Sequence, residues 1–282
     1  MDRVAVLITC HNRKDTTLIC LKMLYKQRNI DLINLDVYLV DDGSTDGTKQ
    51  AVANKYKNIK ILEGDGKLYW CGGMRLAWSE AMKTHYDAYL WLNDDTLLYE
   101  GALMTLITTW KHKLAIGKGG IIVGTTCDSK IGKASYGGYL NDSSNPIEPL
   151  EVPQRCDLIN GNIVLVPNHV FERLGNLSNI YTHSMGDKDY SLRAGKKGIP
   201  IWVAPGFQGE CKRNSPPEWT LEVFPLVHRF KILHSPKGLP PREYRAYLKL
   251  RNGNRWPLYM IKLYLRVFIP QLWRLKRRNN LL

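Results

Sequence analysis

The first part of the chain alternates between short apolar runs and segments whose apolar residues recur at helical spacing. Residues 4–10 (VAVLITC) are rich in Val and Ile, as buried parallel strands are, and Leu then recurs at helical spacing over residues 18–25. Strand-like residues 35–48, 58–66 and 88–96 are each followed by a helical pattern. This alternation predicts an α/β fold, with a mostly parallel sheet flanked by helices.

The pattern is less regular in the second part of the chain. Residues 119–126 predict a strand, residues 155–175 a strand followed by a helix, and residues 186–206 an acidic helix and a strand. Residues 135–153 are rich in Gly, Asn, Ser and Pro and predict loops or a β-excursion. Apolar residues from Trp256 onward recur at helical spacing, which predicts a C-terminal helical extension.

Polar residues follow three of the predicted strands at the point where each strand ends, at residues 9–12, 41–44 and 93–95. The carboxyl ends of parallel strands meet at one rim of the sheet, and ligands of such sheets bind there. Asp94 and Asp95 come directly after an apolar run, although burial of an unpaired carboxylate is unfavourable. The sequence therefore predicts a ligand site around these acids.

The phosphate-binding glycine motifs of other nucleotide-binding proteins do not occur here. No G-x-G-x-x-G follows the first strand, and the chain contains no G-x-x-x-x-G-K-[ST], which argues against a Rossmann dinucleotide site and a P-loop. Carboxylates at strand ends suit another task, in which one accepts hydrogen bonds from a base or ribose and another holds Mg2+ or Mn2+. Such a cation needs few protein carboxylates when a diphosphate supplies further ligands.

The net charge of +14 favours an anionic partner. Much of the excess lies in residues 242–282, which contain eleven Lys or Arg and one acid, Glu243. Two interpretations of the tail helix stay open: its apolar face packs against the domain, or it lies on an anionic membrane surface with its cations on the lipid. No recognisable nucleic-acid-binding module accompanies these cations, so no nucleic acid partner is expected.

We expect the protein to be cytoplasmic, with peripheral binding at the inner face of the membrane. The six cysteines show no C-x-x-C spacing, and the N-terminus lacks the basic-then-apolar pattern of a signal peptide. The chain has no uninterrupted apolar run of about 18 residues, the length expected of a membrane-spanning helix.

Four segments, VLITCHNR, VYLVDDGSTDGT, WLNDDT and GDKDYSLRAGKKG, occur in an order and at separations that resemble the family 2 inverting glycosyltransferases of the GT-A fold. The resemblance covers residues 3–235, most of the chain. It implies a Rossmann-like GT-A glycosyltransferase domain over residues 1–235. A basic, aromatic and amphipathic helical extension would follow over residues 236–282.

The resemblance implies inverting, metal-dependent transfer of a sugar from a UDP- or dTDP-linked donor. The acceptor would be a hydroxyl of a glycan or lipid-linked saccharide in cell-surface polysaccharide synthesis. Bacterial rhamnosyltransferase-like and galactofuranosyltransferase-like members look similar. A sugar nucleotidyltransferase and a non-catalytic basic binding protein stay open as alternatives. A nucleotidyltransferase would have a basic, Gly-rich phosphate loop directly after the first strand, but the segment there, TCHNRKD, contains no glycine. The presence of Asp42, Asp95 and Asp187 argues against a non-catalytic protein with a degenerate site.

The resemblance also implies a donor site at the predicted rim. Its nucleotide-sugar-binding residues would be Thr9, His11, Asn12, Asp42, Gly72, Gly73, Arg75 and Asp94. Asp42 would accept from the base N3–H, the two glycines would let the backbone approach the diphosphate-sugar, and Arg75 would meet a phosphate. The alternatives are a turn and helix cap for DDGSTDG and a solvent-facing position for Arg75. Tyr69 and Trp70 either flank the donor sugar or simply pack.

By the same resemblance Asp95 would hold Mg2+ or Mn2+, and Asp94 would bind the ribose or a metal-bound water. Capping is the alternative for both acids. Asn93 takes the position at which many family members have an acid. Relatives often supply a His as a further metal ligand, but that position falls on Cys211, a poor ligand for magnesium. His234 is therefore the predicted second metal ligand, against the alternative of a packed or surface His.

Asp187 falls on the general base of the family motif. Inverting transfer needs a carboxylate that takes the proton of the acceptor hydroxyl, and the alternative is an acid that stabilises a helix N-terminus. Gly186 replaces the acid that usually precedes the base, while Asp189 and Arg193 are spaced for an ion pair along a helix. Residues 160–162 would lie near the donor sugar, or form a turn before a strand.

Overall fold

The computed structural model describes residues 1–141 and 143–271, and the chain divides into two compact units. The first unit comprises Met1–Asn179 and Gly186–Arg213, and the second comprises Ile180–Met185 and the chain from Asn214 onward. The domain boundary after residue 235 stays a prediction. The part of the predicted extension beyond residue 271 lies outside the described residues.

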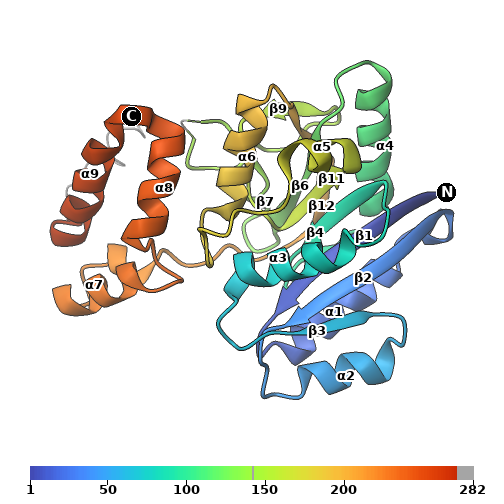
Figure 1. Cartoon of the computed structure of the whole chain (residues 1–282), viewed down its shortest axis with the longest axis horizontal. Helices are drawn as coiled ribbons and strands as arrows, with labels where there is room; N and C mark the ends of the chain where they lie inside the picture. The colour runs from blue at the N-terminus through green and yellow to red at the C-terminus, as the bar shows by residue number, and fades with distance from the viewer. Residues whose placement is uncertain (142, 272–282) are drawn as a thin grey trace. The chain divides into compact units, whose positions relative to one another are not determined.

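Strands and helices alternate in the first unit in the predicted order (Figure 1). Its strands are β1 (Asp2–Cys10), β2 (Ile33–Asp41), β3 (Lys60–Glu63), β4 (Ala88–Leu92), β5 (Leu97–Leu98), β6 (Ile121–Asp128), β7 (Lys133–Tyr136), β8 (Gly138–Tyr139), β9 (Gln154–Cys156), β10 (Leu158–Ile159), β11 (Ile163–Pro167) and β12 (Ile201–Glu210). Its helices are α1 (Lys14–Tyr25), α2 (Thr48–Lys55), α3 (Tyr69–Ala81), α4 (Ala102–Ala115), α5 (Asn168–Leu174) and α6 (Gly186–Lys196). The α/β prediction is confirmed.

The main sheet is mixed but mostly parallel, with the order β3-β2-β1-β4-β11-β6-β12-β5. β1 is parallel to β2 and β4, β2 to β3, and β6 to β12. β11, however, runs antiparallel to both of its neighbours, β4 and β6, which the pattern did not predict. The described residues between β6 and β11 form short strands and loops. Strands joined without a helical crossover can pair antiparallel, whereas a parallel pair needs the crossover.

Alternate side chains of β1 enter two hydrophobic layers on opposite faces of the sheet. Val4, Val6 and Ile8 pack with residues of α1, α2 and α4, whereas Ala5 and Leu7 pack with residues of α3, α5 and α6. Each fully buried Val, Leu or Ile side chain contributes about 1.5–3 kcal/mol. The sheet is thus a rigid support for the residues at its rim.

The second unit contains α7 (Leu226–His234), α8 (Pro241–Asn252), α9 (Trp256–Phe268) and the segment 180–185. Its hydrophobic core consists of Trp219, Leu233, Leu263 and Val267. Glu243 of α8 is buried and accepts hydrogen bonds from the Thr182 N–H at 3.1 Å and the Thr182 hydroxyl at 2.8 Å. These two bonds attach the segment 180–185 to this unit.

α9 is the predicted C-terminal helix, and its apolar residues are divided between two faces. Leu263 and Val267 are buried within the unit, whereas Leu258, Ile261 and Leu265 are 58%, 57% and 42% exposed. None of the helices within residues 1–141 and 143–271 has both the length and the apolarity to cross a membrane.

Candidate functional site

The polar residues after β1, β2 and β4 lie at one rim of the sheet. Cys10 at the end of β1 is paired with Asp41 at the end of β2, and β4 is the other parallel neighbour of β1. The three polar segments therefore leave the sheet on the same side, as the sequence predicts. Side chains far apart in the sequence meet there.

Asp42 is 3% exposed and holds the loop that leads into α3. Its Oδ1 accepts from the N–H groups of Gly66 and Leu68 at 2.9 and 3.2 Å, and its Oδ2 accepts from that of Tyr69 at 2.9 Å. A carboxylate offers about four acceptor positions, and in the described part of the chain three N–H groups donate to this one, which leaves a fourth position. The predicted contact with a base N3–H would use that position and stays a prediction.

His11 and Asn12, at the end of β1, are tied to the loop after β2. His11 Nδ1 donates to the Asp42 carbonyl at 2.6 Å, which leaves His11 Nε2 to accept from Asn12 Nδ2 at 3.2 Å. Asn12 has a left-handed φ of 52°, and its Oδ1 accepts from the Thr45 N–H at 2.7 Å. These bonds hold the predicted base pocket in one shape. Base binding by Thr9, His11 and Asn12 stays a prediction.

The glycines of α3 allow this helix to approach β1. A Cβ on Gly73 would lie only 2.1 Å from Thr9 Oγ1, and Gly72 is buried beside it. Gly73 is therefore required for packing on Thr9 whatever ligand lies nearby. Arg75 Nη1 donates to the Ser178 carbonyl at 2.9 Å, which gives this Arg a partner within the fold. Contacts of Gly72, Gly73 and Arg75 with a donor stay predictions.

Asp94 and Asp95 share one cation, the guanidinium of Arg13. Arg13 Nη1 lies 3.0 Å from Asp94 Oδ1 and 2.8 Å from Asp95 Oδ2. Burial raises the pKa of Asp94 to about 7, against the lowering effect of the Arg13 charge. Asp94 Oδ2 is buried and has no hydrogen-bond partner in the described part of the chain. An acid in this position favours additional positive charge.

This acid pair fits the predicted cation. The carboxylates of Asp94 and of half-buried Asp95 offer the hard oxygen ligands that Mg2+ and Mn2+ prefer. Over residues 1–141 and 143–271, no three His, Cys, Asp or Glu side chains form a metal cage. A diphosphate would have to complete the coordination. Cys211 Sγ lies 3.9 Å from Asp95 Oδ1, but a soft sulfur is a poor ligand for Mg2+.

His234, the predicted second metal ligand, belongs to α7 in the second unit. Its Nδ1 donates to the Phe230 carbonyl at 2.8 Å, and the two rings stack with 5.8 Å between their centroids. Its Nε2 lies 3.5 Å from the Tyr264 hydroxyl oxygen. The ring therefore has a packing role within its own unit, and its ligation of a cation stays a prediction.

Asn93, at the position of the family's acid, uses both ends of its amide. Its Oδ1 accepts from the Trp70 indole at 2.7 Å, and its Nδ2 donates to Asn162 Oδ1 at 2.9 Å. Asn162 Nδ2 lies 3.3 Å from the Thr96 hydroxyl. An ionised carboxylate could accept from the indole but could not donate to Asn162. Asn93 thus connects α3 with the turn before β11.

Asp187 lies in the first turn of α6, and both of its carboxylate oxygens accept hydrogen bonds. Oδ1 accepts from the Lys188 N–H at 2.8 Å and Oδ2 from the Gly161 N–H at 3.1 Å. Burial raises the pKa of Asp187, and the nearby Lys188 charge opposes the rise. A raised pKa makes a carboxylate a stronger proton acceptor. The role of general base stays a prediction.

The indole of Trp70 connects the neighbourhood of the acid pair with that of Asp187. A Cβ on Gly161 would lie 2.3 Å from Trp70 Cζ2. A Cβ on Gly186 would lie 2.5 Å from Cys71 Sγ and 3.8 Å from Trp70 Cζ3. The first residues of α3 thus fill the space that a side chain at residue 186 would need, which is a physical reason for Gly at this departure from the family motif.

The ion pair predicted within α6 is confirmed. Arg193 Nε donates to Asp189 Oδ2 at 2.8 Å. The same guanidinium donates to the Leu174 and Asn176 carbonyls at 2.7 and 3.1 Å. These contacts fix α6 to the segment after α5 and thereby limit the movement of Asp187.

Arg13 contacts both acids, although the sequence pattern did not indicate it. One signal was available, because Arg13 is a cation directly after the polar end of β1, on the rim that carries the acids. For Trp70 the sequence left packing and donor contact open. Its packing on Gly161 is now established, and contact with a donor sugar stays a prediction.

A family model described as Glycosyl transferase family 2 matches residues 5–156. None of the curated proteins matches the chain in sequence. Among solved structures, the chain is similar to the mannosyltransferase PcManGT from Pyrobaculum calidifontis in complex with GDP-Man and Mn2+. That likeness has 16% identity and a TM-score of 0.56, and it covers 99% of this chain and 80% of that chain.

A second similar structure is S. aureus TarS 1-349 in complex with UDP-GlcNAc. Here the identity is 12% and the TM-score 0.59, with 90% of this chain and 73% of that chain covered. At such identities the likeness concerns the fold alone.

Proposed function

This chain belongs to glycosyl transferase family 2 and is a glycosyltransferase with the GT-A fold, and from that premise we propose that it catalyses an inverting, metal-dependent transfer. The donor is a nucleoside diphosphate sugar, UDP- or dTDP-linked. The acceptor is a hydroxyl of a glycan or lipid-linked saccharide in the synthesis of a cell-surface polysaccharide. Family membership sets aside the sugar nucleotidyltransferase and the non-catalytic binding protein.

One observation carries this proposal: the acids at the rim and the proposed base are joined by direct contacts. Asp94 follows Asn93, which accepts from the Trp70 indole. Trp70 packs on Gly161, whose N–H donates to Asp187. A cation site and a base held in one packed assembly are what an in-line displacement at an anomeric carbon needs.

Each end of that assembly has a distinct task in the proposal. Asp187 accepts the proton of the acceptor hydroxyl while the oxygen attacks the anomeric carbon on the side opposite the diphosphate. Asp95 would hold Mg2+ or Mn2+, as the resemblance implies. The resemblance assigns Asp94 to the ribose or a metal-bound water, and we extend its role to the cation because one nitrogen of Arg13 already joins the two carboxylates. When bound, this cation offsets the charge that grows on the leaving diphosphate. The complex of the similar PcManGT with GDP-Man and Mn2+ supports a divalent cation.

The nucleotide is bound, in this proposal, by residues at the ends of β1 and β2. Asp42 accepts a hydrogen bond from the base at the fourth acceptor position of its carboxylate, the one to which Gly66, Leu68 and Tyr69 do not donate. Both similar structures were solved with nucleoside diphosphate sugars. A donor of this class therefore agrees with the fold, and UDP and dTDP have the N3–H that Asp42 would recognise.

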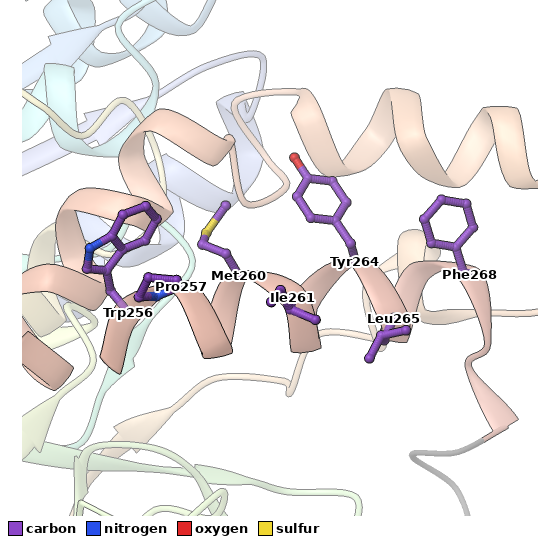
Figure 2. Close-up of a pocket in the computed structure, with 7 residues that line it drawn as sticks. All are labelled: Trp256, Pro257, Met260, Ile261, Tyr264, Leu265 and Phe268. Atoms are coloured by element: carbon purple, nitrogen blue, oxygen red, sulfur yellow. The ribbon is translucent and has the colours of Figure 1, made fainter. Parts of the chain in front are cut away.

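For the acceptor we propose a lipid-linked saccharide at the inner, anionic face of the membrane. Figure 2 shows the apolar side chains of α9 that line a shallow pocket: Trp256, Pro257, Met260, Ile261, Tyr264, Leu265 and Phe268. Cations accompany them, because Arg245 and Lys249 lie over the Trp256 ring at 5.9 and 5.4 Å. Apolar side chains in the headgroup region with cations on anionic lipid give peripheral binding.

The donor site is tested with Mn2+ and a panel of UDP-, dTDP- and GDP-sugars, by thermal shift and by slow donor hydrolysis. One class of donor should stabilise the protein in the presence of Mn2+. Asp95→Ala should abolish this metal-dependent shift, whereas Glu100→Gln, a change at a largely exposed carboxylate, should preserve it. The proposal fails if no sugar nucleotide stabilises the wild type or if Asp95→Ala binds like it.

A further inference from the structure

A single nitrogen of Arg13 bridges the two acids at the rim. Its Nη1 lies 3.0 Å from Asp94 Oδ1 and 2.8 Å from Asp95 Oδ2. We propose that Arg13 substitutes for the divalent cation on Asp94 and Asp95 before the donor binds, and moves to the donor's diphosphate when the cation takes its place. This inference rests on the metal-dependent function proposed above.

The geometry is that of a competitor for the cation. Both contacts are made by the same atom, so a positive centre lies between the two carboxylates where a shared metal ion would lie. A divalent cation on those oxygens would come within a few ångströms of the guanidinium, and like charges at such a distance repel strongly in a partly buried site. The metal and Arg13 therefore exclude each other.

Arg13, and not the acid pair, is the part that can move. The Arg13 side chain is 50% exposed, whereas that of Asp94 is 8% exposed. Arg13 also precedes α1 as its N-cap residue. A long, half-exposed side chain can change rotamer without moving the backbone. Asp94 thus stays in position during the exchange.

The diphosphate is the destination that the chemistry favours. A guanidinium binds phosphate oxygens with two parallel hydrogen bonds, and it is less strongly hydrated than an ammonium. Arg13 lies directly before the 12-residue helix α1, whose N-terminal dipole also favours an anion near this cation. Released from the acids, Arg13 can contact a diphosphate that reaches the rim with the metal.

The first test measures Mn2+ binding alone, by electron paramagnetic resonance, with no nucleotide present. Arg13→Gln removes the competitor, so the apparent Mn2+ affinity should rise by about threefold or more, since a competing state lowers apparent affinity by the fraction it occupies. Arg28→Gln is the matched control. Arg28 is in the same unit and pairs with the exposed Glu100 at 3.1 Å, so its loss changes net charge equally and should leave the affinity unchanged.

The second test measures UDP, dTDP and GDP binding by calorimetry at saturating Mn2+. For the nucleoside diphosphate that binds the wild type, Arg13→Gln should lower the affinity by about tenfold, because one charge-assisted contact is lost. Arg28→Gln should leave this affinity unchanged. The opposite directions of the two effects are the signature of the exchange. Arg13→Lys is the second variant should Arg13→Gln not fold. It should keep the Mn2+ affinity of the wild type and lose several-fold in diphosphate affinity.

The outcomes separate this inference from the function on which it rests. Mn2+ affinity that is unchanged or weaker in Arg13→Gln overturns the exchange, as does diphosphate affinity that is unchanged in both Arg13 variants. Asp95→Asn should lose Mn2+ binding. If it binds Mn2+ like the wild type, the metal site itself is wrong, and the proposed function fails together with the inference.

Discussion

The Trp70 indole N–H donates to Asn93 Oδ1 at 2.7 Å, and this bond joins the first turn of α3 to the residue that precedes the acid pair. The same ring packs on Gly161, the residue that donates to Asp187. We therefore expect Trp70 to position both ends of the proposed site through these two neighbours.

Trp70→Phe keeps an aromatic ring but leaves Asn93 Oδ1 without its donor. We expect the free energy of unfolding to fall by about 0.5–1.5 kcal/mol, the net contribution of one hydrogen bond at this half-buried acceptor, and donor hydrolysis to slow. Urea denaturation and hydrolysis of the donor measure the two effects. Trp202→Phe is the control, because Trp202 lies at the start of β12 and donates to the Lys118 carbonyl at 3.0 Å, whereas the rim acids follow the carboxyl ends of β2 and β4. Equal loss of activity in both variants would refute the positioning role.

Gly186→Ala should destabilise the protein through one identified contact. The added Cβ would lie 2.5 Å from Sγ of the fully buried Cys71, and overpacking of this kind costs about 1–3 kcal/mol. In Cys71→Ala the nearest remaining atom of residue 71, Cβ, is 3.7 Å away, an ordinary contact.

The double variant Gly186→Ala with Cys71→Ala should therefore be less destabilised than the sum of the two single variants. Denaturant unfolding of all four proteins gives the coupling energy. Strict additivity would mean that the Cys71 thiol is not what excludes a side chain at residue 186.

The rate of donor hydrolysis should fall as the pH is lowered through the pKa of Asp187. Burial raises this pKa above its usual value of 3.8, and only the ionised carboxylate is a base, so the rate rises with pH through the raised pKa and then levels off. The pH–rate profile at saturating Mn2+ and donor measures this limb. Asp187→Asn should keep donor binding and lose hydrolysis, whereas Glu100→Gln should keep the wild-type profile.

The same shift has a consequence for stability. The pKa of Asp187 is higher in the folded protein than in the unfolded chain. At a pH above the folded-state pKa, the ionised carboxylate therefore lowers the free energy of unfolding, and this cost disappears once the pH is below the unfolded-state pKa. The free energy of unfolding of Asp187→Asn, relative to that of the wild type, should therefore fall as the pH is lowered, because only the wild type loses this cost. The amide has one acceptor oxygen for the two N–H groups, a loss that is the same at every pH. Urea unfolding at several pH values measures this relative change. A free energy of unfolding of Asp187→Asn that rises relative to the wild type on acidification would contradict the direction of the pKa shift.

Paired acidic substitutions on the exposed face of α9 should weaken membrane binding. Ile261 and Leu265 are 57% and 42% exposed, so Ile261→Asp with Leu265→Asp should preserve the fold while removing two side chains from the headgroup region. Co-sedimentation with vesicles that contain anionic lipid measures the loss of membrane binding. Binding of the wild type should also weaken as the salt concentration rises.

Ile131→Asp is the matched control, because Ile131 is 58% exposed but lies in the first unit. It should bind vesicles like the wild type. Equal binding by the α9 variant and the wild type would remove α9 from the membrane proposal.

The amino-acid sequence by itself was enough to predict the α/β fold and the meeting of the acids. Apolar runs of strand length followed by helical spacing predict parallel strands, and parallel strands place their carboxyl ends on one rim. Asp42, Asp94 and Asp95 had to lie there once β1, β2 and β4 were neighbours. The Asp189–Arg193 ion pair was also predictable, because it depends only on helical spacing.

Only the tertiary structure decided which partners these residues have. The direction of β11 depends on the connection that leads to it, and the pairing of Arg13 with two acids more than 80 positions away depends on where β1 ends beside β4. The Gly at position 186 is accounted for by the packing of α6 on Cys71. Hydrophobic periodicity reports the face on which a side chain lies. The neighbour across that face is set by the packing of all the elements together, and no local pattern contains it.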